Sequence, residues 1–341
     1  AQAACFTKCQ REVCCCRQEF SVAMIAEAID TAGVAVITGG ASGFGLLVAE
    51  RLVRKGMAVA ILDVSVAELA EAQPKLQALG AGKVLAIKCD VAKFEDCAAA
   101  QREVAAAFPG TPVSFLFNNA GILGSQAGRI LAGNHEVWNQ IFSVNVFGVV
   151  HIIKTFLPGM IGAGPLPSGK KSFVVTTSSV VGLLNHNVGP YSVSKMTATA
   201  ISEQLALELE SMDAKAAHVS PHSLHPTVVA GTKFLLGRGA DGQAGMSSLF
   251  RDTLVKSEGA TPEDIVDGLF RGLDEGKCYI VVDHPTDVPT SKQIAMRLED
   301  QMNGRRPRAP EQLGMLLKVT DPEAFSRRQQ MLRGQAAASR L

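Results

Sequence analysis

The sequence predicts an α/β fold in which helices cover both faces of a parallel sheet of about seven strands. Short apolar runs alternate with amphipathic segments of helical period from about residue 33 to residue 300. The runs are continuously apolar, which is typical of parallel strands buried on both faces. A glycine cluster directly follows the first run. Together these observations predict repeated strand–helix–strand units and therefore a doubly wound sheet.

The elements follow one another in a regular order. The runs expected to form strands are 34–37, 58–62, 84–88, 113–117, 172–177, 217–224 and 278–282. The segments expected to form helices are 46–55, 94–108, 136–160 and 191–211, with a further helix that begins near Thr261-Pro262, a good cap followed by a proline. Pro221 is unfavourable within a buried strand because it cannot donate to the ladder.

Composition limits the classes of protein to which the chain can belong. Of 341 residues, 47% are hydrophobic and 19% charged, so a large core is expected. The 33 basic and 32 acidic residues give a net charge of +1, which predicts no nucleic-acid partner. We find no run of about 18 consecutive apolar residues and expect no transmembrane segment.

Both ends differ from the central domain, which we expect over residues 33–303. Residues 1–32 contain five of the eight cysteines but no paired CxxC or histidine pair, so we expect no metal site. The three scattered cysteines indicate a reduced, cytoplasmic protein, or an organellar one if residues 1–32 include the remnant of a targeting sequence. Residues 304–341 hold eight basic and three acidic residues and are expected to form a basic tail.

The glycine cluster, residues 38–45, lies between the first expected strand and the first helix. Glycines allow a tight turn and close approach of a pyrophosphate to the backbone, and the helix N-terminus favours its negative charge. Asp63 ends the second strand about 20 residues later, where a carboxylate can accept hydrogen bonds from a ribose diol. Together these features predict a dinucleotide site, although Asp63 alone also fits an ordinary helix cap.

The motifs resemble those of the short-chain dehydrogenase/reductase family. Five motifs occur in the order typical of that family: TGxxxGxG at residues 38–45, Asp90-Val91, Asn118-Asn-Ala-Gly121, Asn145 and Tyr191-xxx-Lys195. The resemblance covers about residues 33–300 and implies a Rossmann fold that binds NAD. It implies cofactor contacts from Thr38, Gly39, Ser42, Gly43, Phe44, Gly45, Asp63, Asp90, Val91, Asn118, Ala120, Gly121, Tyr191, Lys195 and Thr232.

The expected catalytic pair is Tyr191 and Lys195, which share one face of a helix because they are four residues apart. A phenol with a pKa of about 10 is a poor base at neutral pH. A nearby ammonium is expected to lower that pKa, so that the phenol can exchange a proton with an alcohol oxygen. The resemblance implies that Lys195 also binds the nicotinamide ribose and that Asn145 serves as a proton relay.

Two adjacent serines compete for the third role, polarisation of the substrate oxygen. The family's SxxG turn selects Ser179, whereas its usual separation of about 13 residues from the tyrosine selects Ser178. We prefer Ser179 because the turn is the local geometric constraint, and we expect Ser178 to be structural.

The segment after the sixth strand departs from the family, because His225-Pro226-Thr227 stands where the family usually has Pro-Gly. Thr232 would replace the family's later threonine. We expect the substrate loop at about residues 228–259, and its apolar residues suggest an apolar substrate: Phe234, Leu235, Leu236, Met246, Leu249 and Phe250. His186 either borders the substrate pocket or lies on the surface.

These observations predict an oxidoreductase that transfers a hydride between NAD and a secondary alcohol or ketone. The resemblance also implies a homodimer or homotetramer formed through the long helices. Two alternatives remain at this point. One is an NADPH-dependent carbonyl reductase. The other is a non-catalytic dinucleotide-binding regulatory or scaffold protein on the same fold.

Overall fold

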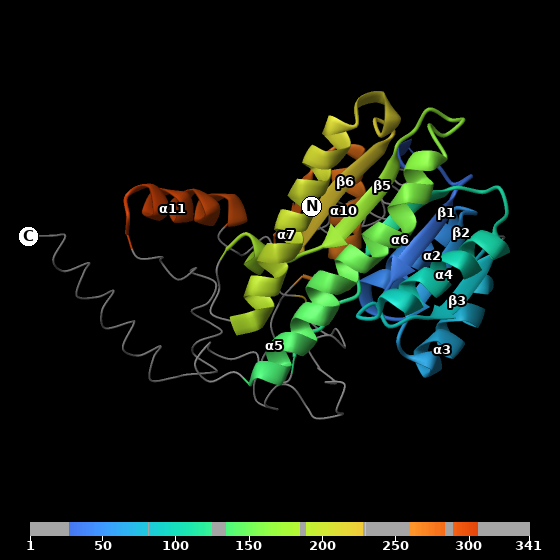
Figure 1. Ribbon diagram of the computed structural model, residues 1–341, viewed down its shortest axis with the longest axis horizontal. Helices are drawn as coiled ribbons and strands as arrows, with labels where there is room; N and C mark the ends of the chain where they lie inside the picture. The colour runs from blue at the N-terminus through green and yellow to red at the C-terminus, as the bar shows by residue number, and fades with distance from the viewer. Residues whose placement is uncertain are drawn as a thin grey trace, which may run out of the picture.

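A single parallel sheet of seven strands, in the order β3-β2-β1-β4-β5-β6-β7, organises the molecule (Figure 1). The computed structural model describes residues 27–80, 82–124, 134–184, 189–227, 229, 260–283 and 289–305. The strands are β1 (Val34–Thr38), β2 (Ala58–Asp63), β3 (Val84–Lys88), β4 (Val113–Asn118), β5 (Ser172–Thr177), β6 (Val219–Pro226) and β7 (Tyr279–Val282). This confirms the predicted fold class.

Helices cover both faces of the sheet. They are α2 (Gly43–Arg54), α3 (Val66–Gln77), α4 (Phe94–Ala107), α5 (His135–Phe142), α6 (Gly148–Gly162), α7 (Gly189–Ser211), α10 (Pro262–Asp274) and α11 (Thr290–Met302). Short helical turns span Ser143–Phe147, Val180–Gly182 and Asp213–Lys215. One apolar cluster joins the sheet to α2, α3 and α10, and a second joins it to α4, α6 and α7. The sheet is therefore doubly wound.

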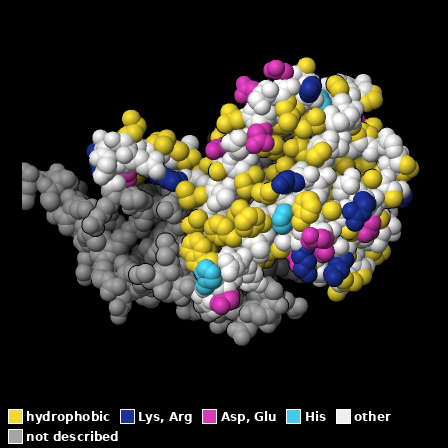
Figure 2. Space-filling view, viewed as in Figure 1, with side chains coloured by type: hydrophobic (Ala, Val, Ile, Leu, Met, Phe, Trp, Pro, Cys, Tyr) yellow, Lys and Arg dark blue, Asp and Glu magenta, His cyan; other side chains and the backbone are white. Residues whose placement is uncertain are grey.

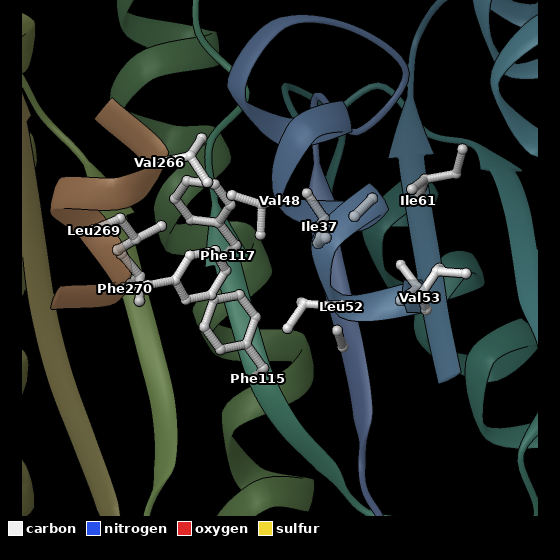
Figure 3. Close-up of a cluster of buried hydrophobic side chains, with 14 of the residues drawn as sticks. Ile37, Val48, Leu52, Val53, Ile61, Phe115, Phe117, Val266, Leu269 and Phe270 are labelled. Atoms are coloured by element: carbon white, nitrogen blue, oxygen red, sulfur yellow. The ribbon is translucent and has the colours of Figure 1, made fainter. Parts of the chain in front are cut away.

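Aromatic and branched side chains fill the first of these clusters (Figure 3). Phe115 and Phe117 from β4 are fully buried and meet Leu52 of α2 and Leu269 and Phe270 of α10. Burial of each such side chain contributes about 1.5–3 kcal/mol. The packing fixes the two helices that flank the carboxyl ends of β1 and β4.

The long helix expected over residues 136–160 is interrupted. A π-helical turn, Ser143–Phe147, separates α5 from α6 and contains the buried Asn145. By length and mean hydropathy (1.6) the combined helix His135–Gly162 could cross a bilayer, with 39% of its most apolar window buried. It packs against β4 and α4 and brings Asn145 towards α7, as a core helix of this fold does.

Pro221 is accommodated within β6 because of the direction in which it faces. Ser223 and Thr227 donate their N–H groups to carbonyls at Cys278 and Val282, so odd-numbered residues of β6 face β7. The backbone of Pro221 also faces β7, but β7 begins to pair with β6 only at Ser223. The missing N–H therefore removes no ladder hydrogen bond. The strand spans Val219–Pro226, two residues later than expected.

The domain begins earlier than the expected boundary at residue 33. Ile29 is 2% exposed within the first apolar cluster. The Asp30 carboxylate accepts hydrogen bonds from Ser168 Oγ at 2.5 Å and from the Ala32 N–H at 2.9 Å. Residues 29–30 therefore belong to the fold because they close the amino ends of β1, β4 and β5. Residues 1–26 and 306–341 lie outside the described residues.

Candidate active site

The predicted site residues gather at the carboxyl ends of the central strands. The strand order reverses between β1 and β4, and ligands of doubly wound sheets bind at this switch point. The glycine loop follows β1, Asp63 ends β2, the Asn118–Gly121 segment follows β4, and Ser178 and Ser179 follow β5. The chain thus brings motifs that are far apart in sequence to one edge of the sheet.

The glycine loop has the conformation that a phosphate site requires. Gly39 and Gly43 have φ values of +61° and +54°, which favour glycine, and no described atom lies within 4 Å of a Cβ built at Gly43. A Cβ at Gly45 would lie 2.2 Å from the Gly39 carbonyl oxygen, so glycine permits the close packing of α2. Among the described residues, Ser42 makes no side-chain cap bond, and the first turn of α2 has no acid. The donors at this helix end fit a pyrophosphate.

Asp63 and Asp90 lie after neighbouring strands. The Asp63 carboxylate accepts from the N–H groups of Ala41 (3.2 Å) and Ser65 (3.1 Å), which ties it to the glycine loop. Burial raises the pKa of Asp63, while these hydrogen bonds oppose the shift. Asp90 accepts from the Ala92 N–H at 3.1 Å, and next to it the largely buried Val91 lies near Thr38, Asn118 and Ala120. Both acids thus border the predicted adenosine end.

Asn119 joins β1, β4 and β5, although the sequence analysis gave it no role. Its side-chain amide donates to the carbonyls of Thr38 (3.2 Å) and Gly39 (3.3 Å), and its Oδ1 accepts from Thr177 Oγ1 at 3.3 Å. Thr38 Oγ1 in turn accepts from the N–H groups of Asn119 and Ala120 at 3.0 and 3.1 Å. The position of Asn119 within Asn118-Asn-Ala-Gly121 was the only available signal in the sequence.

Tyr191 and Lys195 lie near the start of α7, where both are buried. Tyr191 is 8% exposed, and its hydroxyl is hydrogen-bonded to the Ser179 side chain. Lys195 Nζ donates to the Thr177 carbonyl at 2.8 Å and lies 5.9 Å from the centroid of the Tyr191 ring. The structure therefore brings together the predicted tyrosine, lysine and serine.

The expected lowering of the tyrosine pKa is wrong for the protein by itself. Burial raises the pKa of Tyr191 well above its ordinary value, and the Ser179 hydrogen bond only partly opposes this. Burial also lowers the pKa of Lys195 to about 8, since an ammonium loses solvation in the interior. Desolvation is thus the largest cause of both shifts.

Asn145 is held rigidly beside the lysine. Its Oδ1 accepts from the Ile122 N–H at 2.8 Å, while Nδ2 donates to the Ile122 carbonyl at 2.9 Å and to Ser194 Oγ at 3.0 Å. A Cβ at Gly121 would lie 3.2 Å from Lys195 Nζ and 3.3 Å from Asn145 Oδ1. The absence of a side chain at Gly121 thus lets the lysine and the asparagine lie close together.

The two serines have different surroundings. Ser178 is 1% exposed, and its Oγ lies 2.8 Å from both the Lys195 carbonyl and Thr199 Oγ1, deep against α7. Ser179 instead contacts Tyr191 and caps the turn Val180–Gly182. This contrast supports the preference for Ser179. Thr232, His186 and nearly all of the expected substrate loop lie outside the described residues.

His225 is a second residue for which the sequence analysis proposed no role. It is fully buried (0% exposed), its Nδ1 lies 3.1 Å from the Ser179 carbonyl oxygen, and its Nε2 lies 2.8 Å from Ser223 Oγ. Burial lowers the pKa of His225 to about 4, so the imidazole is neutral at physiological pH. The departure from Pro-Gly at this position was its only signal in the sequence.

Comparison with known proteins agrees with this geometry. The chain is 28% identical over 254 residues to the C alpha-dehydrogenase of Sphingobium sp. strain SYK-6, an alignment that covers 73% of this chain and 79% of the relative. It is 29% identical over 198 residues to the cyclohexanol dehydrogenase of Acinetobacter sp. strain SE19, covering 58% and 75% of the two chains.

A solved structure also resembles the chain closely enough to compare the folds. A short chain dehydrogenase/reductase from Burkholderia phymatum, in complex with NAD, superimposes with a TM-score of 0.69 and 28% identity. The match covers 82% of this chain and 97% of that structure. The short chain dehydrogenase family profile matches residues 33–234, more than half of the chain. The chain is therefore an oxidoreductase of the short-chain dehydrogenase/reductase family.

Proposed function

We propose that this protein transfers a hydride between NAD(H) and a secondary alcohol or ketone of apolar character. The observation that carries the proposal is the buried cluster in which Ser179 contacts Tyr191 and Lys195 lies beside both Tyr191 and Asn145. A regulatory or scaffold protein would have no use for a phenol, a hydroxyl and an ammonium that converge at the end of a strand.

The residues divide the chemistry among them. NAD would accept the hydride during oxidation, and NADH would supply it during reduction. In the oxidation the phenolate form of Tyr191 takes the proton of the alcohol, and in the reduction the phenol gives its proton to the ketone oxygen. Tyr191 is hydrogen-bonded to Ser179, and because burial disfavours the phenolate, the oxidation depends on a positive charge nearby. Ser179 Oγ donates to the substrate oxygen and stabilises its developing charge. Lys195, held by the Thr177 carbonyl, keeps a positive charge near the phenol.

The cofactor would lie along the edge defined by β1, β2 and β4. The donors at the start of α2 would hold its pyrophosphate, Asp63 its adenosine ribose, and Asp90 and Val91 its adenine. Lys195 would bind the nicotinamide ribose. The charge of Asp63 favours NAD over NADP, whose additional phosphate would lie beside a carboxylate.

The apolar character of the proposed substrate rests on the composition of residues 228–259, and cyclohexanol dehydrogenase is among the relatives. A screen of secondary alcohols with NAD and NADP, followed by nicotinamide absorbance, would identify the class. Reduction of a ketone with NADPH but not with NADH would instead establish the carbonyl-reductase alternative.

The decisive test is Tyr191→Phe, which removes the phenolic oxygen and keeps the ring. We expect a loss in kcat of about 10²–10⁴-fold, because the proton-transferring group is lost. NAD affinity measured by calorimetry should change little. A Tyr191→Phe variant with wild-type turnover would refute the catalytic assignment.

A further inference from the structure

We infer that His225 is a positioning residue, which holds the Ser179 backbone and thereby directs the Ser179 hydroxyl at the reacting oxygen. The inference rests on the proposed function, because it concerns the same serine. His225 lies 46 residues from Ser179 in the sequence but faces it across the end of the β5–β6 pair.

The hydrogen bonds determine which tautomer His225 adopts. The Ser179 carbonyl oxygen can only accept, so Nδ1, at 3.1 Å, must carry the proton. Nε2 is then an acceptor and accepts a hydrogen bond from the Ser223 hydroxyl, with Oγ at 2.8 Å. The same hydroxyl has an alternative acceptor, the Cys278 carbonyl, but at the longer distance of 3.3 Å. Ser223 therefore fixes the tautomer of the imidazole, and the imidazole supplies a side-chain donor to the Ser179 carbonyl.

The Ser179 hydroxyl makes only long contacts with the residues beside it, so its direction depends on how the Ser179 backbone is held. Ser179 Oγ lies 3.4 Å from both the Pro226 carbonyl and the Val181 N–H, near the limit for a hydrogen bond. Its carbonyl oxygen accepts from the Gly182 N–H at 2.8 Å, within the same turn, and from His225 Nδ1 at 3.1 Å, so His225 links the turn to β6. Full burial of the imidazole excludes water that would compete for that carbonyl.

His222 provides a matched control on the same strand. It is 2% exposed and, like His225, donates from Nδ1 to a backbone carbonyl, that of Lys277 at 2.7 Å. It packs on Phe173, with ring centroids 5.4 Å apart, and its hydrogen bond is to Lys277 rather than to Ser179. Replacement of His222 disturbs β6 in a comparable way without touching Ser179.

The experiment is a double-mutant cycle on kcat. His225→Leu removes the donor, and we expect kcat to fall by up to about 10²-fold, the cost of misplacing a reacting group by about 1 Å. The dissociation constant of NAD should stay the same, since the glycine loop and Asp63 lie elsewhere. His225→Asn, whose side-chain amide can replace Nδ1–H, should lose less than about fivefold. His222→Leu should leave kcat per folded protein unchanged.

The double-mutant cycle with Ser179→Ala distinguishes an effect of His225 through Ser179 from a wider disturbance of the active-site structure. If His225 acts through Ser179, His225→Leu should cause no further loss in the Ser179→Ala background, because groups that act as a unit are not additive. Three outcomes would overturn the inference. The first is a full additional loss of kcat from His225→Leu in the Ser179→Ala background. The others are a wild-type kcat for His225→Leu and equal losses of kcat for His225→Leu and His225→Asn. Unchanged turnover of Ser179→Ala alone would instead overturn the catalytic assignment of Ser179 and this inference with it.

Discussion

At the scale of single residues, one step along the chain after β5 separates a structural serine from a reactive one. The extended backbone turns successive side chains to opposite sides, so Ser178 points into α7 and Ser179 towards Tyr191. The sequence left two spacing rules in conflict at this point. Contacts with residues 12 to 21 positions away distinguish the serines, and no local rule includes such contacts.

The two serines should therefore respond differently to replacement. We expect Ser179→Ala to lower kcat by about 10²-fold or more through loss of a donor to the substrate oxygen. Ser178→Ala should instead lower the free energy of unfolding by about 1–3 kcal/mol, because the buried Lys195 carbonyl and Thr199 hydroxyl lose a partner. Steady-state kinetics and urea unfolding of both variants would check this. The reverse pattern would favour the separation rule.

The prediction that NAD is preferred over NADP rests on the charge of Asp63. A ribose phosphate within about 4 Å of its carboxylate would be repelled by about 4 kcal/mol at an effective dielectric of 20. Neither the glycine loop nor the two residues after Asp63 carry a basic side chain. Arg51, further along α2, is paired with Asp267 and stacks on Phe270. The local chain thus offers no compensating charge.

We expect the protein to bind NAD at least about tenfold more tightly than NADP, which is about 1.4 kcal/mol. Asp63→Ala should narrow that preference by removing both the repulsion and the hydrogen bonds to the ribose. Calorimetric titration of both cofactors would measure the ratio of their dissociation constants. The same ratio in Asp267→Ala, which releases Arg51, serves as a comparison. Equal or tighter binding of NADP by the wild type would disprove the preference.

At the scale of elements, hydrophobic pattern predicted the strands and most helices to within a few residues. The parallel strands are buried on both faces, so their continuous apolar runs are easy to recognise in the sequence. The interruption at Asn145 is not, because the apolar pattern of the helix continues before and after it. Within the π-turn, Asn145 accepts from the Ile122 N–H and donates to the Ile122 carbonyl and to Ser194 Oγ, which are contacts between elements. Asn119 and His225 were missed for the same reason, since Asn119 contacts Thr38, 81 residues away, and His225 contacts Ser179, 46 residues away.

The long helices also bear on assembly, which we propose to occur through them. Phe147, next to α6, and Leu207, on α7, are 55% and 61% exposed. Hydrophobic side chains gather on the face that α6 and α7 present (Figure 2). A large exposed apolar patch of this kind is typical of a protein interface.

We expect sedimentation to show a dimer or tetramer, and Phe147→Asp or Leu207→Asp to shift it to a smaller species by placing a charge in the contact. Val66→Asp is the matched control, because Val66 is 60% exposed on α3. Equal masses for all three variants would contradict the proposed interface. The measurement should be made at several protein concentrations, because association follows mass action.

At the scale of the whole molecule, the buried imidazoles of β6 link the stability of the fold to pH. Burial lowers the pKa of His225 to about 4 from an ordinary value of 6.5, and Lys195 nearby adds to the shift. Burial also lowers the pKa of His222. The folded protein keeps both rings neutral, whereas the unfolded chain protonates them once the pH falls below about 6.5. Acid therefore favours the unfolded chain.

The contribution of His225 can be isolated by comparing the wild type with His225→Asn, which cannot titrate in this range. Between pH 8 and pH 5 the wild type should lose about 2 kcal/mol more free energy of unfolding than the variant, because the unfolded imidazole gains a proton that the folded one still refuses. The extra loss should begin near pH 6.5 and level off below about pH 4, where the folded ring also titrates. Urea unfolding across this range, at one protein concentration, would measure the difference. Parallel curves for the two proteins would mean that His225 is protonated as readily in the fold as in the unfolded chain, and the neutral tautomer assigned to it would then be wrong.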